Sequence, residues 1–308
     1  MNPLRRALSE YLSLRRALGY KLVRTEKLLN QFLAYLEKDG AEIVTIEAAL
    51  NWARRCTDGA VNWQAHRLSV VRGFASHLHV RDVRNEIPST DLLPSGPHRA
   101  NPYLYSDEDI AALLAATASL KTPLRRITFR TLIALLAVTG MRIGEAIRLN
   151  RNDIDFRNGL LRVLLSKFGK SRELVVHPTA LRALADYLRQ RKRLSPSPST
   201  AAVFTSSAGT RLLYCNVQWT FHRLVRLAGL SPRSASCRPR IHDLRHSFAV
   251  RSLLDAYAAG KDGQTTLTLL STYLGHVNPA CTYWYLSASP ELLAFAAQRL
   301  ELHLGGRP

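Results

Sequence analysis

A segment rich in proline and glycine divides this chain into two parts. Residues 87–97 hold three prolines and one glycine, and proline ends helices and removes a donor that the interior of a sheet needs. At 308 residues, the chain is also longer than most domains with a single core. We therefore predict one domain with its linker over residues 1–98 and a second domain over residues 99–308.

Apolar periodicity predicts that the first domain is helical. Apolar side chains three and four residues apart form one stripe over residues 4–18 and another over residues 28–36, as in amphipathic helices. Thr45 is a suitable N-cap for a third helix over residues 46–55, and residues 62–78 supply a fourth. A compact unit of four helices is the simplest fold.

The second domain is predicted to be mostly helical with a small β-sheet. Strands are expected over residues 160–166 and 172–177, joined by a turn at residues 167–170. Ser106 should begin the first helix, because acidic residues follow it near the positive helix end. Further helices are predicted over residues 126–138, 179–194, 215–229, 242–258, 264–274 and 289–302.

A strong excess of positive charge indicates a polyanionic partner. The formal net charge is +20, and residues 99–308 carry most of it, with 29 basic against 13 acidic side chains. Such a balance favours nucleic acid or an acidic membrane surface. No lysine-rich amphipathic helix or lipid signal supports the membrane, and the longest apolar stretch, residues 132–138, is too short to cross one.

The cysteines indicate a reducing compartment. They are scattered and form no Cys-x-x-Cys pair, so the sequence predicts neither a zinc ribbon nor a disulfide scaffold. The N-terminal residues are polar and lack an apolar signal core. We therefore expect a cytoplasmic protein.

Arg142 is the first candidate for binding a phosphate. It follows Gly140, and glycine commonly ends helices, so the arginine should emerge at the start of the next helix. Arginine suits phosphoryl chemistry because its planar fork binds two oxygens and stays protonated. Considered alone, an arginine three residues before Glu145 is more simply a surface ion pair.

His242, Arg245 and His246 share one face of a predicted helix, because they are three and four residues apart. Together they can point at a phosphate. Considered alone, His242 would be an ordinary buried histidine with a hydrogen bond. The two histidines also have the spacing of a zinc pair, but no glutamate adjoins His242 and no cysteine pair lies nearby.

The triplet Leu274-Gly275-His276 places a third histidine just after a helix, because glycine is a typical C-terminal cap. Tyr285 follows this histidine by nine residues, and Tyr283 lies two residues before Tyr285. Adjacent helical residues diverge by about 100°, so the two tyrosines cannot share one direction. Chemistry alone does not choose between them as a nucleophile.

Lysine usage singles out the turn between the predicted strands. The chain has 35 arginines but only eight lysines, and Lys167 and Lys170 both lie in this turn. Arginine stays protonated near neutral pH, whereas a lysine can be tuned to donate a proton. The alternative is a solvated turn whose composition is due to chance.

In this order and at this spacing, the motifs resemble the active site of the tyrosine recombinases, the phage-integrase and Xer-like family. The resemblance implies a helical N-terminal core-binding domain of SAM-like fold and a mixed α/β catalytic domain, which close on DNA as a clamp. The family spacing selects Tyr285 as the nucleophile and leaves Tyr283 for packing or DNA contact. Lys167 matches the first lysine of the family pattern Lys-Gly-x-Lys-x-Arg, although Phe168 replaces the glycine.

The resemblance also implies a reaction. The tyrosine attacks a scissile phosphate and forms a 3′-phosphotyrosyl bond that conserves the energy of the broken bond, so neither ATP nor a metal cofactor is expected. The implied roles are base for His242, transition-state ligands for Arg142 and Arg245, proton donor for Lys167, phosphate ligand for His276 and nucleophile for Tyr285.

The implied partners are double-stranded DNA in the nucleoid and further copies of the chain, which exchange strands in a tetrameric synapse. Accessory recombinases and DNA-bending proteins belong to the same expectation. The predicted last helix carries an apolar stripe that would pack either on a neighbouring protomer or on its own domain. This stripe consists of Leu292, Leu293, Phe295, Ala296 and Leu300.

Residues 283–291 further resemble recombinases carried by transposons, a type of mobile genetic element. Two other functions are compatible with the same motifs. One is a type IB topoisomerase-like enzyme, which nicks and closes DNA without exchange, and the other is a DNA-binding relative that has lost catalysis. A helical partner-binding domain and a short chain favour recombination over the topoisomerase. The complete set of candidate residues argues against lost catalysis.

Overall fold

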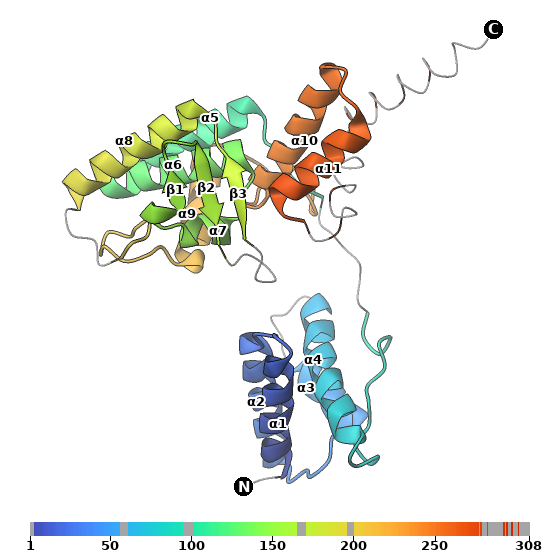
Figure 1. The fold of residues 1–308 in the computed structure, drawn as a ribbon. Helices are drawn as coiled ribbons and strands as arrows, with labels where there is room; N and C mark the ends of the chain where they lie inside the picture. Colours follow the sequence, from blue (N-terminus) through green and yellow to red (C-terminus); the bar gives the residue numbers. More distant parts are fainter. Residues whose placement is uncertain are drawn as a thin grey trace. The chain divides into compact units, whose positions relative to one another are not determined.

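The computed structural model describes residues 3–55, 61–94, 101–164, 171–195 and 200–276, together with residues 278, 282, 292, 294, 297 and 301. Its internal contacts divide the chain into two compact units, Met1–Arg99 and Ala100–Pro308 (Figure 1). Within these described ranges, no helix is both long enough and apolar enough to span a membrane.

The first unit is built from four helices, drawn in blue to cyan in Figure 1: α1 (Pro3–Ala17), α2 (Val23–Lys38), α3 (Ile46–Arg54) and α4 (Val61–His79). Their apolar faces meet in one core that includes the fully buried Leu29, Phe32 and Phe74. Thr45 caps α3, and its hydroxyl oxygen accepts a hydrogen bond from the backbone N–H of Ala48. The predicted four-helix unit is confirmed.

The predicted apolar stripe of the first helix is wrong at its C-terminal end. The buried residues of α1 stop at Leu12, and Leu14 and Leu18 are 53% and 65% exposed. The helix ends at Ala17, and Gly19 turns the chain with φ +87°. Leu18 therefore does not continue the helical face, although its spacing in the sequence fits.

The second unit is mostly helical and contains one small sheet among its described residues. Its elements are α5 (Asp107–Ala116), η1 (Thr117–Ser119), α6 (Pro123–Thr139), α7 (Ile143–Arg148), η2 (Arg151–Asp153), β1 (Ile154–Asp155), β2 (Leu160–Val163), β3 (Arg172–Val175), α8 (Pro178–Leu194), α9 (Tyr214–Leu227), α10 (Asp243–Ala258) and α11 (Gly263–Leu274). Ser106 caps α5, and its hydroxyl accepts a hydrogen bond from the backbone of Asp109. The mostly α fold with a small sheet is confirmed.

The sheet is antiparallel, with strand order β1-β2-β3. Leu161 pairs with Leu174 in its centre, and both side chains are fully buried. Val163 pairs with Arg172, so the two strands point toward the predicted turn. The turn itself, with Lys167 and Lys170, lies outside the described residues. Strand β1 was not predicted, because a two-residue strand has no alternation to recognise.

Helix α6 is the central packing element of this unit. It contacts α5, α8 and α10, and its buried residues include Phe129, Leu132 and Ile133. Helix α11 contacts both α10 and β3 (Figure 1). The packing therefore brings the last turn of α11 to the edge strand of the sheet.

One residue of the predicted C-terminal helix packs on its own domain. Leu292 is buried in an apolar cluster with Leu253 of α10 and Leu267, Leu270 and Leu274 of α11. This placement favours the own-domain alternative for Leu292. The other members of the stripe, Leu293, Phe295, Ala296 and Leu300, lie outside the described residues.

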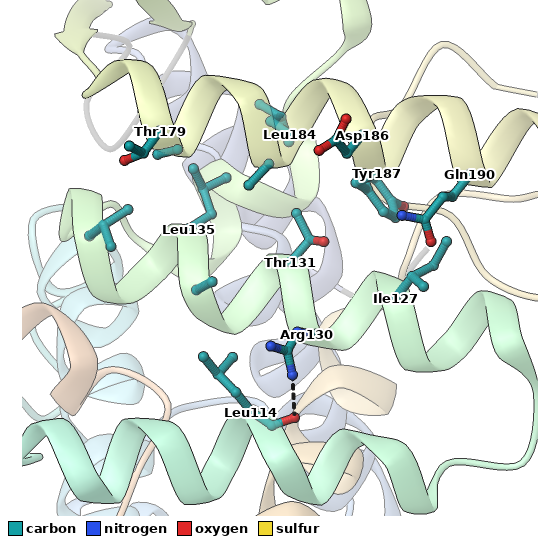
Figure 2. Close-up of a pocket in the computed structure, with 14 residues that line it drawn as sticks. Leu114, Ile127, Arg130, Thr131, Leu135, Thr179, Leu184, Asp186, Tyr187 and Gln190 are labelled. Carbon is teal, nitrogen blue, oxygen red and sulfur yellow. Dashed lines mark hydrogen bonds between the residues drawn. The ribbon is translucent and has the colours of Figure 1, made fainter.

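A groove of 580 Å³ lies between α5, α6 and α8. Figure 2 shows Leu135 of α6 and Leu184 of α8 along it, and Arg130 donating a hydrogen bond of 3.5 Å to the carbonyl oxygen of Leu114. None of the residues that line this groove belongs to the described part of the predicted catalytic set. The groove is therefore separate from the candidate active site.

Candidate active site

The break between α6 and α7 positions Arg142. Gly140 caps helix α6 after Thr139 and has φ +58°, in the left-handed region that favours glycine. A Cβ atom at this position would also collide with the ring of Phe248. Arg142 then forms the N-cap of α7, so the arginine emerges at a helix start, as the sequence predicted.

Arg142 is held on two sides. Its Nη1 donates a hydrogen bond to Glu145 Oε1 at 2.9 Å, and its Nη2 donates to the carbonyl oxygen of Gly275 at 3.1 Å. The side chain keeps 24% of its surface exposed, so the guanidinium still reaches solvent. The ion pair with Glu145 exists, but it is not the surface pair that the sequence alone favoured, because Glu145 is buried.

Glu145 joins two arginines from different elements. Arg172 of β3 donates hydrogen bonds from Nη1 and Nη2 to the two carboxylate oxygens, at 3.0 and 2.9 Å. Burial opposes ionisation of Glu145, but the hydrogen bonds from Arg172 and Arg142 outweigh it and lower its pKa to about 2. Arg172 also donates from Nε to the carbonyl oxygen of Tyr273 in α11. The carboxylate therefore ties Arg142 to the sheet and to α11.

Arg245 connects the ends of α6 and α11. It is only 2% exposed, and its Nη1 donates to the carbonyl oxygen of Gly140 at 2.9 Å. Its Nη2 lies 2.8 Å from the carbonyl oxygen of Leu274 and 2.9 Å from Nε2 of His276. Backbone carbonyls thus orient this guanidinium in the same way that Gly275 orients Arg142.

His276 follows the glycine cap that the sequence predicted. Helix α11 ends at Leu274, and Gly275 has φ +68°. The Nδ1 atom of His276 lies 2.7 Å from the hydroxyl oxygen of Thr282. Burial, together with the charges of Arg245 and Arg142, lowers the pKa of His276 to about 4. The imidazole is therefore neutral at pH 7.

His242 and His246 lie together at the start of α10. Their rings are 5.1 Å apart and meet edge to face. His242 is partly open to solvent and counts as an exposed residue. The protein around its ring still desolvates it, and together with the charges of Arg245 and Arg142 this lowers its pKa to about 4. Burial and the neighbouring His242 lower the pKa of His246 to about 3. Both imidazoles are neutral at pH 7, so His242 can accept a proton.

The zinc alternative gains no support from these side chains. Among the described residues, no group of three or more His, Cys, Asp or Glu side chains is arranged to hold a metal ion. His242 also lies near the positive charges of Arg245 and Arg142, which lower its pKa and would repel a metal cation.

The structure therefore brings four of the six predicted residues to one region: Arg142, His242, Arg245 and His276. The other two, Lys167 and Tyr285, lie outside the described residues. Two fixed guanidinium groups thus lie near neutral imidazoles, an arrangement in which the arginines can supply charge to an anion such as a phosphate diester and the histidines can exchange protons. The sequence did not point to Arg172 or Thr282 as site residues. Arg172 ends the run Lys-x-x-Lys-x-Arg, and this place was the one signal in the sequence for its role.

Comparison with known proteins identifies the family. Residues 104–291 match the phage integrase family. The chain belongs to this family. It is 42% identical over 307 residues to y4rB of Sinorhizobium fredii, whose name describes an integrase or recombinase, and the match covers 98% of each chain. It is 30% identical over 218 residues to the tyrosine recombinase XerC of Alcanivorax borkumensis, covering 71% of this chain and 66% of XerC.

Solved structures of integrases share the fold. The integrase of the transposon Tn1549, in complex with transposon right end DNA, matches with a TM-score of 0.65 at 19% identity, over 96% of this chain and 99% of that one. The lambda integrase tetramer bound to a Holliday junction gives 0.62 at 18% identity, over 92% and 76%. As a member of the phage integrase family, the chain is a tyrosine-type site-specific DNA recombinase.

We expect the second unit to lose stability between pH 7 and pH 5. The pKa values of His246 and His276, about 3 and about 4, lie below the ordinary value, so the unfolded chain binds protons that the folded chain excludes. Stability is full above the unfolded pKa of about 6.5 and falls as the pH drops toward 4, by about 2 kcal/mol per histidine at pH 5. Glu145 does not contribute in this window. Its pKa is lowered from 4.5 to about 2, so the stability that its ionised form supplies is lost only below about pH 4.5.

Hydrogen–deuterium exchange in urea at pH 7 and pH 5 measures this change for the second unit separately. His246→Gln should remove about 2 kcal/mol of the pH dependence. His222→Gln, at an exposed position on α9, should leave it unchanged. Equal stability of the unchanged protein at both pH values would contradict the expectation.

Glu145→Gln should destabilise the unit at pH 7 by about 3 kcal/mol, because the shift of its pKa from 4.5 to about 2 corresponds to about 1.4 kcal/mol per unit. The neutral amide leaves two guanidinium groups without their shared anion. Glu173→Gln is the matched control, since Glu173 is an exposed carboxylate on β3 that pairs with Arg162. Urea unfolding of the two variants compares them, and equal midpoints would show that Glu145 has no anchoring role.

Proposed function

We propose that this recombinase cuts and rejoins DNA through a 3′-phosphotyrosyl bond at Tyr285 and exchanges strands between two duplexes. The observation that carries the proposal is the joint anchoring of Arg142 and Arg245 beside His276. Each arginine donates to a carbonyl oxygen of the Leu274–Gly275 segment. This common support favours one phosphate bound by both guanidinium groups.

The roles of the proposed residues follow from charge and protonation. The phenol oxygen of Tyr285 forms a bond to phosphorus while the bond from phosphorus to the 5′-oxygen breaks. His242, whose imidazole is neutral at pH 7, accepts the phenol proton. Lys167 donates a proton to the leaving 5′-oxygen. Arg142 and Arg245 stabilise the charge that develops on the oxygens of phosphorus.

The second half of the reaction reverses the first. A 5′-hydroxyl from another duplex attacks the phosphotyrosyl phosphorus, and the phenolate of Tyr285 leaves. The ester keeps the energy of the original bond, so we propose that rejoining needs no ATP. We propose no metal ion either, because the guanidinium groups supply the positive charge at the phosphate.

Assembly on DNA is the finer part of the proposal. We assign the helical unit Met1–Arg99 as the core-binding domain and the second unit as the catalytic domain, which together clamp double-stranded DNA in the nucleoid. Exchange between duplexes requires several protomers, and a tetramer is the form in which lambda integrase was solved on a Holliday junction. The fold shared with the Tn1549 integrase supports a role in the movement of a mobile element.

Strand exchange separates a recombinase from a topoisomerase-like enzyme. A binding site for the protein is first selected from random duplex DNA, and two labelled duplexes carrying this site are then incubated with the protein. We expect joined products that contain both labels, and none from duplexes with a scrambled site. Relaxation of a supercoiled plasmid without any joined product would instead support the nicking-closing enzyme.

A further inference from the structure

The hydrogen bonds of His276 define its tautomer in the structure. Arginine can only donate hydrogen bonds, so the 2.9 Å contact from Arg245 Nη2 makes Nε2 of His276 an acceptor. The pKa of about 4, caused first by burial and then by Arg245, keeps the ring neutral at pH 7, so one ring nitrogen carries the proton. That nitrogen is Nδ1, which donates to the hydroxyl oxygen of Thr282 at 2.7 Å.

This tautomer does not suit the proposed role of His276 as a phosphate ligand. A phosphate oxygen is an acceptor, so a ring nitrogen that binds it must donate. In the structure, Nε2 accepts from Arg245. For Nε2 to donate to a phosphate, the proton of the neutral ring must move from Nδ1 to Nε2, and Nδ1 must become an acceptor.

The hydroxyl of Thr282 can serve both forms of the ring. A hydroxyl donates one hydrogen bond and accepts others, so it accepts from Nδ1–H in one tautomer and donates to Nδ1 in the other. Thr282 is 1% exposed, so an apolar replacement would leave a buried ring nitrogen facing a group with no hydrogen-bonding capacity. A buried ring nitrogen without a hydrogen-bond partner costs free energy, so a hydroxyl at position 282 matters for the state of His276.

We propose that Thr282 is a positioning residue that allows His276 to change tautomer when a DNA phosphate enters the site. The phosphate replaces Nε2 as a partner of Arg245, and the Thr282 hydroxyl rotates to donate to Nδ1. The number of protons on the ring does not change, because Nδ1 releases one proton to solvent and Nε2 takes one up. This inference rests on the proposed function, because it needs a phosphate between Arg245 and His276.

The position of Thr282 in the chain strengthens this role. It lies six residues after His276 and three residues before Tyr285, so its hydrogen bond joins the segment before the proposed nucleophile to the Gly275 cap.

Rates of covalent attachment to a nicked duplex with the selected site test the inference. We expect Thr282→Val, which keeps the shape but removes the hydroxyl, to slow attachment by roughly 10²-fold, as displaced catalytic groups do, with unchanged DNA affinity. Thr282→Ser should restore attachment. Thr272→Val is the matched control, because Thr272 is exposed on α11 and its hydroxyl donates to the carbonyl oxygen of Thr268 in the same helix.

A spectroscopic measurement does not depend on how the valine variant folds. The ¹⁵N chemical shifts of histidine distinguish a protonated ring nitrogen from an unprotonated one. We expect His276 to carry its proton on Nδ1 in the free Tyr285→Phe chain and on Nε2 in its complex with the nicked duplex. The same tautomer in both states, or attachment by Thr282→Val at the wild-type rate, would overturn the inference. Failure of the unchanged chain to attach would instead contradict the proposed function.

Discussion

Replacing Tyr285 with phenylalanine should abolish covalent attachment of the recombinase to DNA while leaving DNA binding intact. The substitution removes one oxygen, which is the atom proposed to bond to phosphorus, and keeps the ring. Loss of a catalytic nucleophile reduces rates by roughly 10⁴-fold or more. A nicked duplex carrying the selected site traps the adduct, because the short released strand diffuses away before it can attack, and gel electrophoresis under denaturing conditions detects it.

Tyr283→Phe is the matched control for this experiment, because it makes the same change two residues earlier in the chain. We expect it to attach at nearly the wild-type rate, with at most a small loss of DNA affinity. Attachment that survives in Tyr285→Phe and disappears in Tyr283→Phe would show that the family spacing from His276 selects the wrong tyrosine.

Arg245→Lys should reduce strand cleavage by roughly 10²- to 10³-fold, as the loss of one donor to a developing anion does. Lysine keeps the charge, but its single ammonium group cannot reach Gly140, Leu274 and a phosphate in the geometry of a planar guanidinium. The substitution should also lower stability, by about 1–3 kcal/mol for each buried carbonyl left without a donor. Attachment to the nicked duplex and urea unfolding measure the two effects.

Arg251→Lys provides the matched control on the same helix. Arg251 lies on α10 but is exposed and pairs with Asp107 at the surface. Exposed ion pairs contribute little to stability, so this variant should attach and unfold like the unchanged protein. Equal cleavage by Arg245→Lys and Arg251→Lys would remove Arg245 from the proposed chemistry.

Much of the fold was predictable because its signals are local. Amphipathic periodicity, the caps at Thr45 and Ser106, and the glycines that end α6 and α11 each depend on a few neighbouring residues. The same glycines located Arg142 and His276 relative to helix ends. The family spacing then supplied the roles of residues that lie far apart in the sequence.

The supporting contacts were not predictable, because they join distant segments. Arg172 reaches Glu145 across 27 residues and Tyr273 across 101, and no pattern in the sequence indicates such pairs. The burial of Glu145 has the same cause, since its partner Arg172 comes from β3, far along the chain from α7. The protonation state of His276 depends on Arg245 and Thr282 together, which lie 31 and 6 residues away from it in the sequence.

Identifying the atom that links protein to DNA tests the central claim most directly. The adduct with a nicked duplex is digested with protease and nuclease, and mass spectrometry locates the modified residue and the nucleotide end attached to it. We predict a peptide modified at Tyr285 by a nucleotide joined through its 3′-phosphate. A link at another side chain, or through a 5′-phosphate, would contradict it.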